Sequence, residues 1–270
     1  MVSAKLDALR SAIARHESAL VAFSGGVDST LVLKVAHDVL GDRVIAVTAV
    51  SASLAARENR ETLDLAASIG ATHLIIDSNE LSDPNYAANP TNRCYYCKSE
   101  LYDICAQVAK DRGVSVIFDG LIVDDLTDDR PGRQAAALHR VVSPLLDARF
   151  TKDDVRRAAR ALGLSNWDKA ATPCLSSRVP HGRAITPATL RQIELCEDFL
   201  RDRGFRVVRV RHLGETARLE LGAADLERFD VPTRAAFTRH AASLGFANVI
   251  VDEKGYQRGG ADLPLPVISG

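Results

Sequence analysis

The sequence lacks any run of about 18 apolar residues, the length that a membrane-spanning helix needs. Its first residues, MVSAKLDALRSAIARHE, form a charged amphipathic pattern without the apolar centre of a signal peptide. Internal repeats and low-complexity tracts are missing as well. These absences predict a cytoplasmic protein with no membrane partner.

An excess of either charge is also missing. The chain has 34 lysines and arginines against 35 aspartates and glutamates, a formal net charge of -1. Proteins that attract nucleic acid through a general electrostatic field carry a strong positive balance. We therefore expect no nucleic-acid partner, although a local basic site is compatible with this composition.

Disorder is excluded by the composition, because 46% of the residues are apolar and 26% are charged. Since single cores stop growing near ~250 residues, a chain of 270 residues favours two domains. We expect a nucleotide-binding domain over residues 1–170, a linker carrying chemistry over 171–187, and a small α+β domain over 188–270.

The first domain alternates short β-branched runs with helical periods, which predicts a Rossmann-like parallel sheet covered on both faces. The expected strands are 19–23, 44–50, 72–77 and 114–119, and the expected helices are 29–40, 55–69, 95–110 and 151–162. The second domain is expected to contain helices 188–203 and 233–244 and strands 205–212, 216–221 and 248–252.

The segment VAFSGGVDST carries the strongest local signal. Gly25 and Gly26 allow a sharp turn between a strand and a helix, whose N-terminus attracts anions. Ser24 and Ser29 add hydroxyl donors, and Asp28 is suited to a magnesium ion that bridges phosphates. The loop lacks the lysine of a Walker motif and is not a GxGxxG fingerprint. The alternative is an ordinary glycine-rich turn.

The cysteines are too few and odd in number for a disulfide framework. Cys94 and Cys97 form a CxxC pair, which is compatible with zinc, an iron-sulfur cluster, redox chemistry or core packing. Cys174 lies in an aperiodic loop with Arg178, which is suited to stabilise a thiolate or bind a phosphate. The remaining two, expected to be core thiols, are Cys105 and Cys196.

Further candidates come from loops and strands. The polar segments 81–91 and 120–134 follow predicted strands, where open α/β sheets gather their ligands. Arg209 and Arg211 share one face of a strand and are suited to a substrate phosphate, unless that face is simply solvated. A possible metal-binding or merely acidic surface loop contains Asp124, Asp125, Asp128 and Asp129.

Taken in order, the motifs SGGVDST, NRCYYCK, DDLTDDRPGR, SPLLDARFTKDDVR, PCLSSRVPHG and RVRHLGETARLEL resemble the LarE family of PP-loop sulfur transferases. The resemblance implies an ATP pyrophosphatase fold and AMP transfer to a carboxylate of pyridinium-3,5-biscarboxylic acid mononucleotide, which becomes a thiocarboxylate. It implies that Lys152 neutralises the leaving pyrophosphate; otherwise Lys152 is an exposed lysine. It also implies a homo-oligomer, a hexamer being one option.

The family uses two sources of sulfur. In one branch the cysteine matching Cys174 gives up its own sulfur, and in the other three cysteines hold a 4Fe-4S cluster that carries an extra sulfide. Because Cys94 and Cys97 accompany Cys174, we favour the cluster as metal cofactor beside ATP and Mg²⁺.

One segment departs from the family pattern. The family has Gly-Thr-Asn where residues 120–123 of this chain are Gly-Leu-Ile-Val, so ligand contacts there cannot be carried over.

Two other functions are alternatives to a sulfur transferase of this family. A tRNA thiolase would need a basic RNA footprint, which the neutral charge disfavours. A non-enzymatic nucleotide sensor would leave the Cys174 loop unexplained.

Overall fold

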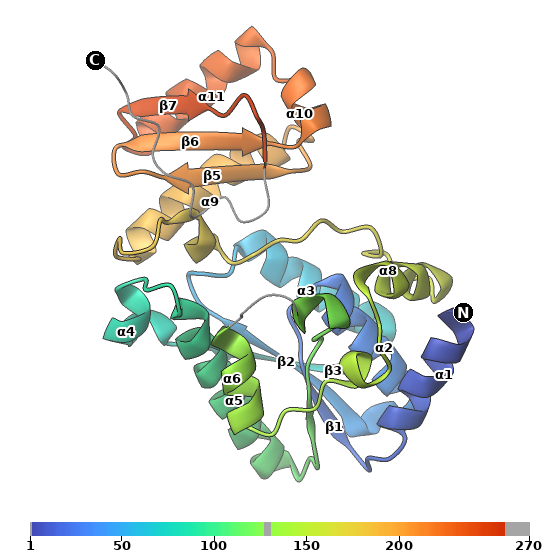
Figure 1. Ribbon diagram of the computed structural model, residues 1–270. Coiled ribbons are helices and arrows are strands. Elements are labelled where there is room, and N and C mark those ends of the chain that lie inside the picture. The colour runs from blue at the N-terminus through green and yellow to red at the C-terminus, as the bar shows by residue number, and fades with distance from the viewer. Residues whose placement is uncertain (1, 127–130, 257–270) are drawn as a thin grey trace. The chain divides into compact units, whose positions relative to one another are not determined.

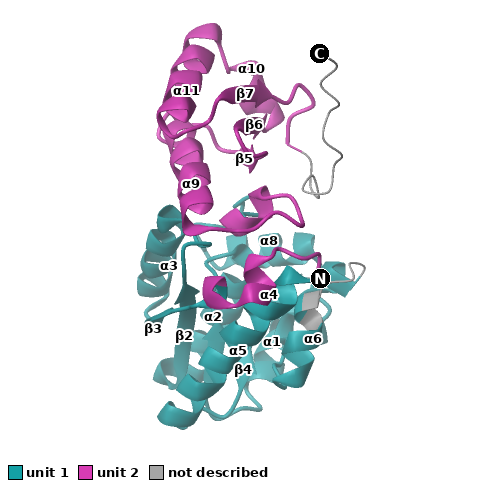
Figure 2. Ribbon diagram, turned by 90° about the vertical axis from the view of Figure 1, so that its left-hand side faces the viewer, with its two compact units in different colours: residues 1–80, 92–172 teal, residues 81–91, 173–270 magenta. Residues whose placement is uncertain are grey.

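The computed structural model describes residues 2–126 and 131–256, and Figure 1 shows the course of the chain. The chain divides into two compact units, coloured separately in Figure 2. Unit 1 comprises residues 1–80 and 92–172, and unit 2 comprises residues 81–91 and 173–270. None of the helices in the described part of the chain combines the length and apolarity needed to span a bilayer.

Unit 1 is built on a parallel sheet in the strand order β3-β2-β1-β4. Its strands are β1 (Ala19–Ala22), β2 (Val44–Val50), β3 (Thr72–Asp77) and β4 (Ile117–Phe118). Its helices are α1 (Val2–Ile13), α2 (Val27–Leu40), α3 (Ala56–Ile69), α5 (Arg93–Arg112), α6 (Pro131–Leu138), α7 (Pro144–Asp147) and α8 (Lys152–Ala161). Short 3-10 turns are η1 (Gly41–Arg43), η2 (Glu80–Ser82), which runs into unit 2, and η3 (Val123–Leu126).

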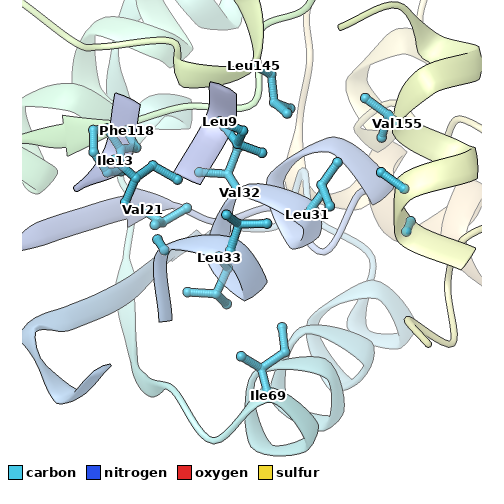
Figure 3. Close-up of a cluster of buried hydrophobic side chains, with 14 of the residues drawn as sticks. Leu9, Ile13, Val21, Leu31, Val32, Leu33, Ile69, Phe118, Leu145 and Val155 are labelled. Carbon is cyan, nitrogen blue, oxygen red and sulfur yellow. The ribbon is translucent and has the colours of Figure 1, made fainter. Parts of the chain in front are cut away.

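Helices cover both faces of this sheet, and β1 is therefore buried along its whole length. On one face Val21 packs in a cluster with Leu9 of α1 and Leu31 of α2 (Figure 3). On the other face Leu20 packs in a cluster with Cys105 of α5. Full burial of an aliphatic side chain of this kind stabilises the fold by about 1.5–3 kcal/mol. The predicted parallel sheet with two covered faces is confirmed.

The strand order marks the place where a ligand is expected. The chain proceeds from β1 to β2 and β3 on one side and then returns to β4 on the other side of β1. In open α/β sheets, ligands bind beyond the carboxyl ends of the strands at such a switch point. The loops that meet there follow Phe23 and Phe118. The strand expected over residues 114–119 is observed only at Ile117–Phe118, and Phe118 forms an isolated bridge with Val142.

Unit 2 contains a sheet in the order β5-β6-β7, antiparallel between the first pair and parallel between the second. Its strands are β5 (Val208–His212), β6 (Thr216–Leu221) and β7 (Asn248–Val251). Its helices are α4 (Pro84–Ala87), α9 (Pro187–Arg201), α10 (Ala223–Glu227) and α11 (Val231–Ser243), with the 3-10 turn η4 (Leu175–Arg178). Val208 and Val210 face a core that contains Phe237 of α11 and Cys196 of α9.

The division into units differs from the expected one at two places. Residues 81–91, expected beside the nucleotide-binding sheet, belong to unit 2. Asn89 donates its amide to two carbonyl groups of the expected linker at 3.2 and 2.8 Å, and Tyr86 hydrogen-bonds Ser176 at 2.7 Å. The expected linker 171–187 is therefore part of unit 2 from residue 173 onward.

A buried ion pair fixes the same loop to α9. Arg178 is 1% exposed and donates Nε and Nη2 to the two carboxylate oxygens of Glu197 at 2.9 and 3.0 Å. Its Nη1 donates to the carbonyls of Pro173 and Cys174 at 2.6 and 3.0 Å. Burial alone would lower the pKa of Arg178, but the Glu197 carboxylate outweighs it and holds this pKa above its ordinary value.

We expect Arg178→Met to lower the free energy of unfolding by about 3 kcal/mol in chemical denaturation. Removing one partner of a buried pair costs about 3–5 kcal/mol, and the lower end applies because Arg201 still pairs with Glu197 at 2.8 Å. The matched control is Arg191→Met on α9, the helix that carries Glu197; its partner is Glu194, and its side chain is 61% exposed. The control should cost less than about 1 kcal/mol, and equal effects would contradict the assignment.

Candidate functional site

The loop after β1 has the backbone of an anion cradle. Gly25 has a φ of 67°, and a Cβ there would lie 2.9 Å from Thr62 Cγ2 of α3, so glycine is required. Gly26 is the N-cap of α2, and no side chain caps this end of the helix. Because the first amide groups of a helix need partners and carry the positive end of its dipole, this turn is suited to a phosphate.

The two serines of the loop lie in different environments. Ser24 is exposed, whereas Ser29 is 4% exposed. The Ser29 hydroxyl donates to the Gly26 carbonyl at 3.1 Å and accepts the Ser24 amide at 3.3 Å. Ser29 therefore shapes the loop in this structure, and the Ser24 hydroxyl stands at its surface.

Asp28 and Lys152, which the sequence placed in separate motifs, form an ion pair. Lys152 Nζ donates to both carboxylate oxygens of Asp28 at 2.9 and 2.7 Å. Burial raises the pKa of Asp28 above its usual value, although Lys152 opposes this shift. Lys152 is the first residue of α8, and its amide donates to the Asp124 carboxylate at 3.0 Å. A cation and a carboxylate suited to a metal-bound phosphate thus stand side by side.

Residues 120–123, the segment that differs from the family pattern, lie next to the same site. A Cβ on Gly120 would lie 2.8 Å from the amide nitrogen of Ser29, so a side chain cannot be accommodated there. The amide of Ile122 donates to Asp125 at 3.1 Å, which holds the first part of this loop. The retained acidic pair, Asp124 and Asp125, therefore has structural partners, while Asp128 and Asp129 lie outside the described residues.

The CxxC pair lies at the start of α5 in unit 1. Cys94 is exposed and Cys97 is half-buried, three residues apart on one face of the helix. Cys105, further along α5, is buried, and burial raises the pKa of its thiol to about 12. Cys196 in the core of unit 2 is likewise buried with its pKa raised to about 12. The expected core thiols are confirmed.

Cys174 lies in unit 2, at the N-cap of η4, and is half-buried. Its carbonyl accepts hydrogen bonds from the Ser177 amide at 2.9 Å and from Arg178 at 3.0 Å. Arg178 therefore holds the backbone of the Cys174 loop. Its expected contact with a phosphate or thiolate stays a prediction, and Glu197, which occupies two of its donors, was not foreseen.

Arg209 and Arg211 share one face of β5, as expected from strand alternation, but both are buried. Arg211 pairs with Glu220 at 3.0 Å and donates to the Ser177 carbonyl at 2.8 Å. Arg209 lies over the ring of Tyr256, and burial together with neighbouring arginines lowers its pKa to about 10. A solvated strand face is therefore excluded, and substrate binding stays a prediction.

In neither unit do the described residues bring three or more His, Cys, Asp or Glu side chains together in a group that could hold a metal ion. The three cysteines favoured as cluster ligands are split between the units, since Cys94 and Cys97 belong to unit 1 and Cys174 belongs to unit 2.

Comparison with known proteins gives the family. No family model matches the chain. It is 38% identical to pyridinium-3,5-bisthiocarboxylic acid mononucleotide synthase of Lactiplantibacillus plantarum, over 96% of this chain and 94% of that protein. It is 44% identical to the uncharacterized protein slr1717 of Synechocystis, over 96% of this chain and 97% of that protein.

A more distant relative supports the fold. The glutamine-hydrolyzing GMP synthase of Chlamydia muridarum is 25% identical over 174 residues, which are 59% of this chain and 34% of that protein. This match fits the ATP pyrophosphatase fold that the loop after β1 and the parallel sheet indicate. The chain is thus an enzyme with the PP-loop ATP pyrophosphatase fold and belongs to the LarE family, that of the pyridinium-3,5-bisthiocarboxylic acid mononucleotide synthases.

Proposed function

We propose that the protein is an ATP-dependent sulfur transferase that converts carboxylates of pyridinium-3,5-biscarboxylic acid mononucleotide into thiocarboxylates. The observation that carries this proposal is the 38% identity, over nearly the whole chain, to a synthase of the bisthiocarboxylic acid product. The cradle after β1 and the adjoining pair of Asp28 and Lys152 supply the groups that the first half of such a reaction needs.

The first half is adenylation. A carboxylate oxygen of the substrate attacks the α-phosphorus of ATP, the bond to the bridging oxygen breaks, and pyrophosphate leaves. The uncapped N-terminus of α2 and the Lys152 ammonium would bind the departing phosphates. Asp28 is the carboxylate suited to hold Mg²⁺, which would neutralise phosphate charge when bound.

The second half places sulfur on the activated carbon. A sulfur nucleophile attacks the acyl carbon, the bond to AMP breaks, and a thiocarboxylate or thioester results. If Cys174 is the nucleophile, loss of its Cα proton and cleavage of its Cβ-S bond release the thiocarboxylate and leave dehydroalanine. If a 4Fe-4S cluster held by Cys94, Cys97 and Cys174 is present, it supplies a sulfide instead and the polypeptide keeps its sulfur.

The cluster is the alternative that we favour. Its support is the donor chemistry of unit 1, where Cys94 and Cys97 lie within one turn at the N-terminus of a long helix and neither forms a disulfide. That end of a helix favours negative charge, which suits an anionic iron-sulfur centre. Cys105 and Cys196 belong to the hydrophobic cores of the two units, and the resemblance to the LarE family implies Cys174 as the third ligand.

Asp28→Ala should lower pyrophosphate release with the pyridinium substrate at least about 100-fold while the melting temperature changes little, because Asp28 lies at a helix start and serves phosphate and metal. Pyrophosphate is measured with a coupled assay. Asp64→Ala, an exposed aspartate on α3, is the control and should keep the wild-type rate. A wild-type rate in Asp28→Ala would rule out the assigned role.

Alkylation should separate the five cysteines into three reactive thiols and two protected ones. With iodoacetamide at pH 8, we expect mass spectrometry to find modification of Cys94, Cys97 and Cys174 in the native, metal-free protein. Cys105 and Cys196 should stay unmodified, because a pKa of about 12 keeps each thiol protonated at this pH. Unfolding in urea should expose both. Rapid native labelling of either core thiol would contradict the division.

The fate of Cys174 distinguishes the two sulfur sources. For anaerobically purified protein we expect an unchanged polypeptide mass after turnover and several turnovers when sulfide is added. Cys94→Ala should lose the visible absorbance and repeated turnover together, while Cys105→Ala on the same helix should keep both. Dehydroalanine at position 174, with Cys94→Ala fully active, would show that Cys174 is the sulfur donor.

A further inference from the structure

The segment after α8 forms hydrogen bonds to the loop that follows β1. Asn166, which is 8% exposed, donates Nδ2 to the Gly25 carbonyl at 3.2 Å and to Thr30 Oγ1 at 3.0 Å. Lys169 points its ammonium toward the same carbonyl at 3.4 Å. The Gly25 carbonyl therefore faces two donors from one short segment, far from it in sequence.

These contacts orient the Asn166 side chain, but they leave its amide oxygen without a hydrogen-bond donor in the part of the chain that the structure describes. Its Oδ1 is buried without a hydrogen-bond partner among the described residues. A buried acceptor left without a partner is unfavourable, so a native structure that keeps one needs a reason. Turning the amide over would place Oδ1 against the Gly25 carbonyl, and the contact that matters is therefore the donor facing that oxygen.

Lys169 is held in place from the opposite side by α3. Its Nζ lies 2.7 Å from Glu58 and 2.6 Å from Glu61, and its side chain is 16% exposed. Burial would lower the pKa of Lys169, but the two glutamates outweigh it and keep the ammonium charged. The cation is thus fixed beside Gly25 rather than mobile.

The peptide bond between Gly25 and Gly26 links these contacts to the expected phosphate site. In a trans peptide the carbonyl and the next N-H point in opposite directions. Donors that hold the Gly25 carbonyl therefore direct the Gly26 N-H toward the cradle, where it makes a long hydrogen bond of 3.4 Å to Ser24 Oγ. Gly26 is the N-cap of α2, so its orientation also sets the first turn of that helix.

We propose that Asn166 and Lys169 are positioning residues that hold the Gly25 peptide so that the loop amides bind the β- and γ-phosphates of ATP. This inference rests on the proposed ATP-dependent function. The two residues act through the loop backbone and touch no reacting atom themselves. Their loss should weaken binding of the pyrophosphate end of ATP while binding of AMP is retained.

The test compares ATP and AMP affinities by calorimetry in the full-length protein with Mg²⁺ and without the pyridinium substrate. Asn166→Asp keeps the shape and replaces the donor with an acceptor, and Lys169→Met keeps most of the stem and removes the charge. Each should weaken ATP binding by about tenfold or more, the scale of a hydrogen bond to a charged group, with AMP affinity changing less than about threefold.

Three further variants guard against a merely structural effect. Thr30→Val removes the second acceptor of Asn166 together with the hydroxyl that donates to the Gly26 carbonyl at 2.9 Å, and it should weaken ATP binding with the same preference for ATP over AMP. Lys169→Arg keeps the charge and should recover part of the ATP affinity. Ser165→Ala, an exposed neighbour, should change neither affinity.

Equal losses of ATP and AMP affinity, or an unchanged ATP affinity in Asn166→Asp and Lys169→Met, would overturn the inference. Because binding is measured without turnover, failure of the wild-type protein to form a thiocarboxylate would overturn the proposed function and leave this result standing.

Discussion

The turn at Gly25, where the buried strand β1 gives way to α2, is the constraint on which unit 1 depends. Its φ of 67°, and the 2.9 Å that would separate a Cβ at this position from Thr62 Cγ2, strongly favour glycine. A Cβ on Gly120 would lie 2.8 Å from the Ser29 amide nitrogen, so the second loop also lies against the start of α2 without a side chain. The backbone of the two loops thus lies close to Thr62 of α3 and Asp28 of α2, and the first amide groups of α2 are suited to bind an anion.

Much of this could be predicted from the sequence because its signals are local. The strand 44–50 was placed at its observed bounds, and the helix 55–69 within one residue, since period and composition within the segment suffice. The glycine-rich turn was recognised by its own residues. The expected strand 114–119 was too long because only Ile117 and Phe118 pair with β1, and pairing is not a local property.

Contacts between distant residues could not be predicted in the same way. Asp28 and Lys152 lie 124 residues apart, and although the resemblance implies a role at the phosphates for each, no feature of either motif indicates their direct ion pair. Residues 81–91 follow a strand of unit 1, yet Tyr86 and Asn89 hold the Cys174 loop of unit 2. Glu197 lies in an ordinary amphipathic helix, so its role as the partner of Arg178 has no sequence signal.

The pair of Asp28 and Lys152 also explains how a partly buried carboxylate is tolerated before a nucleotide arrives. Burial disfavours the charged carboxylate, and the ammonium offsets this without removing the pair from solvent, since the two side chains are 25% and 35% exposed. Under the proposed function, an incoming triphosphate would offer Lys152 another anion, and the cation that accompanies it would offer Asp28 another positive partner. Both groups would therefore exchange partners without either charge being left buried and unpaired, as a site that binds and releases phosphate requires.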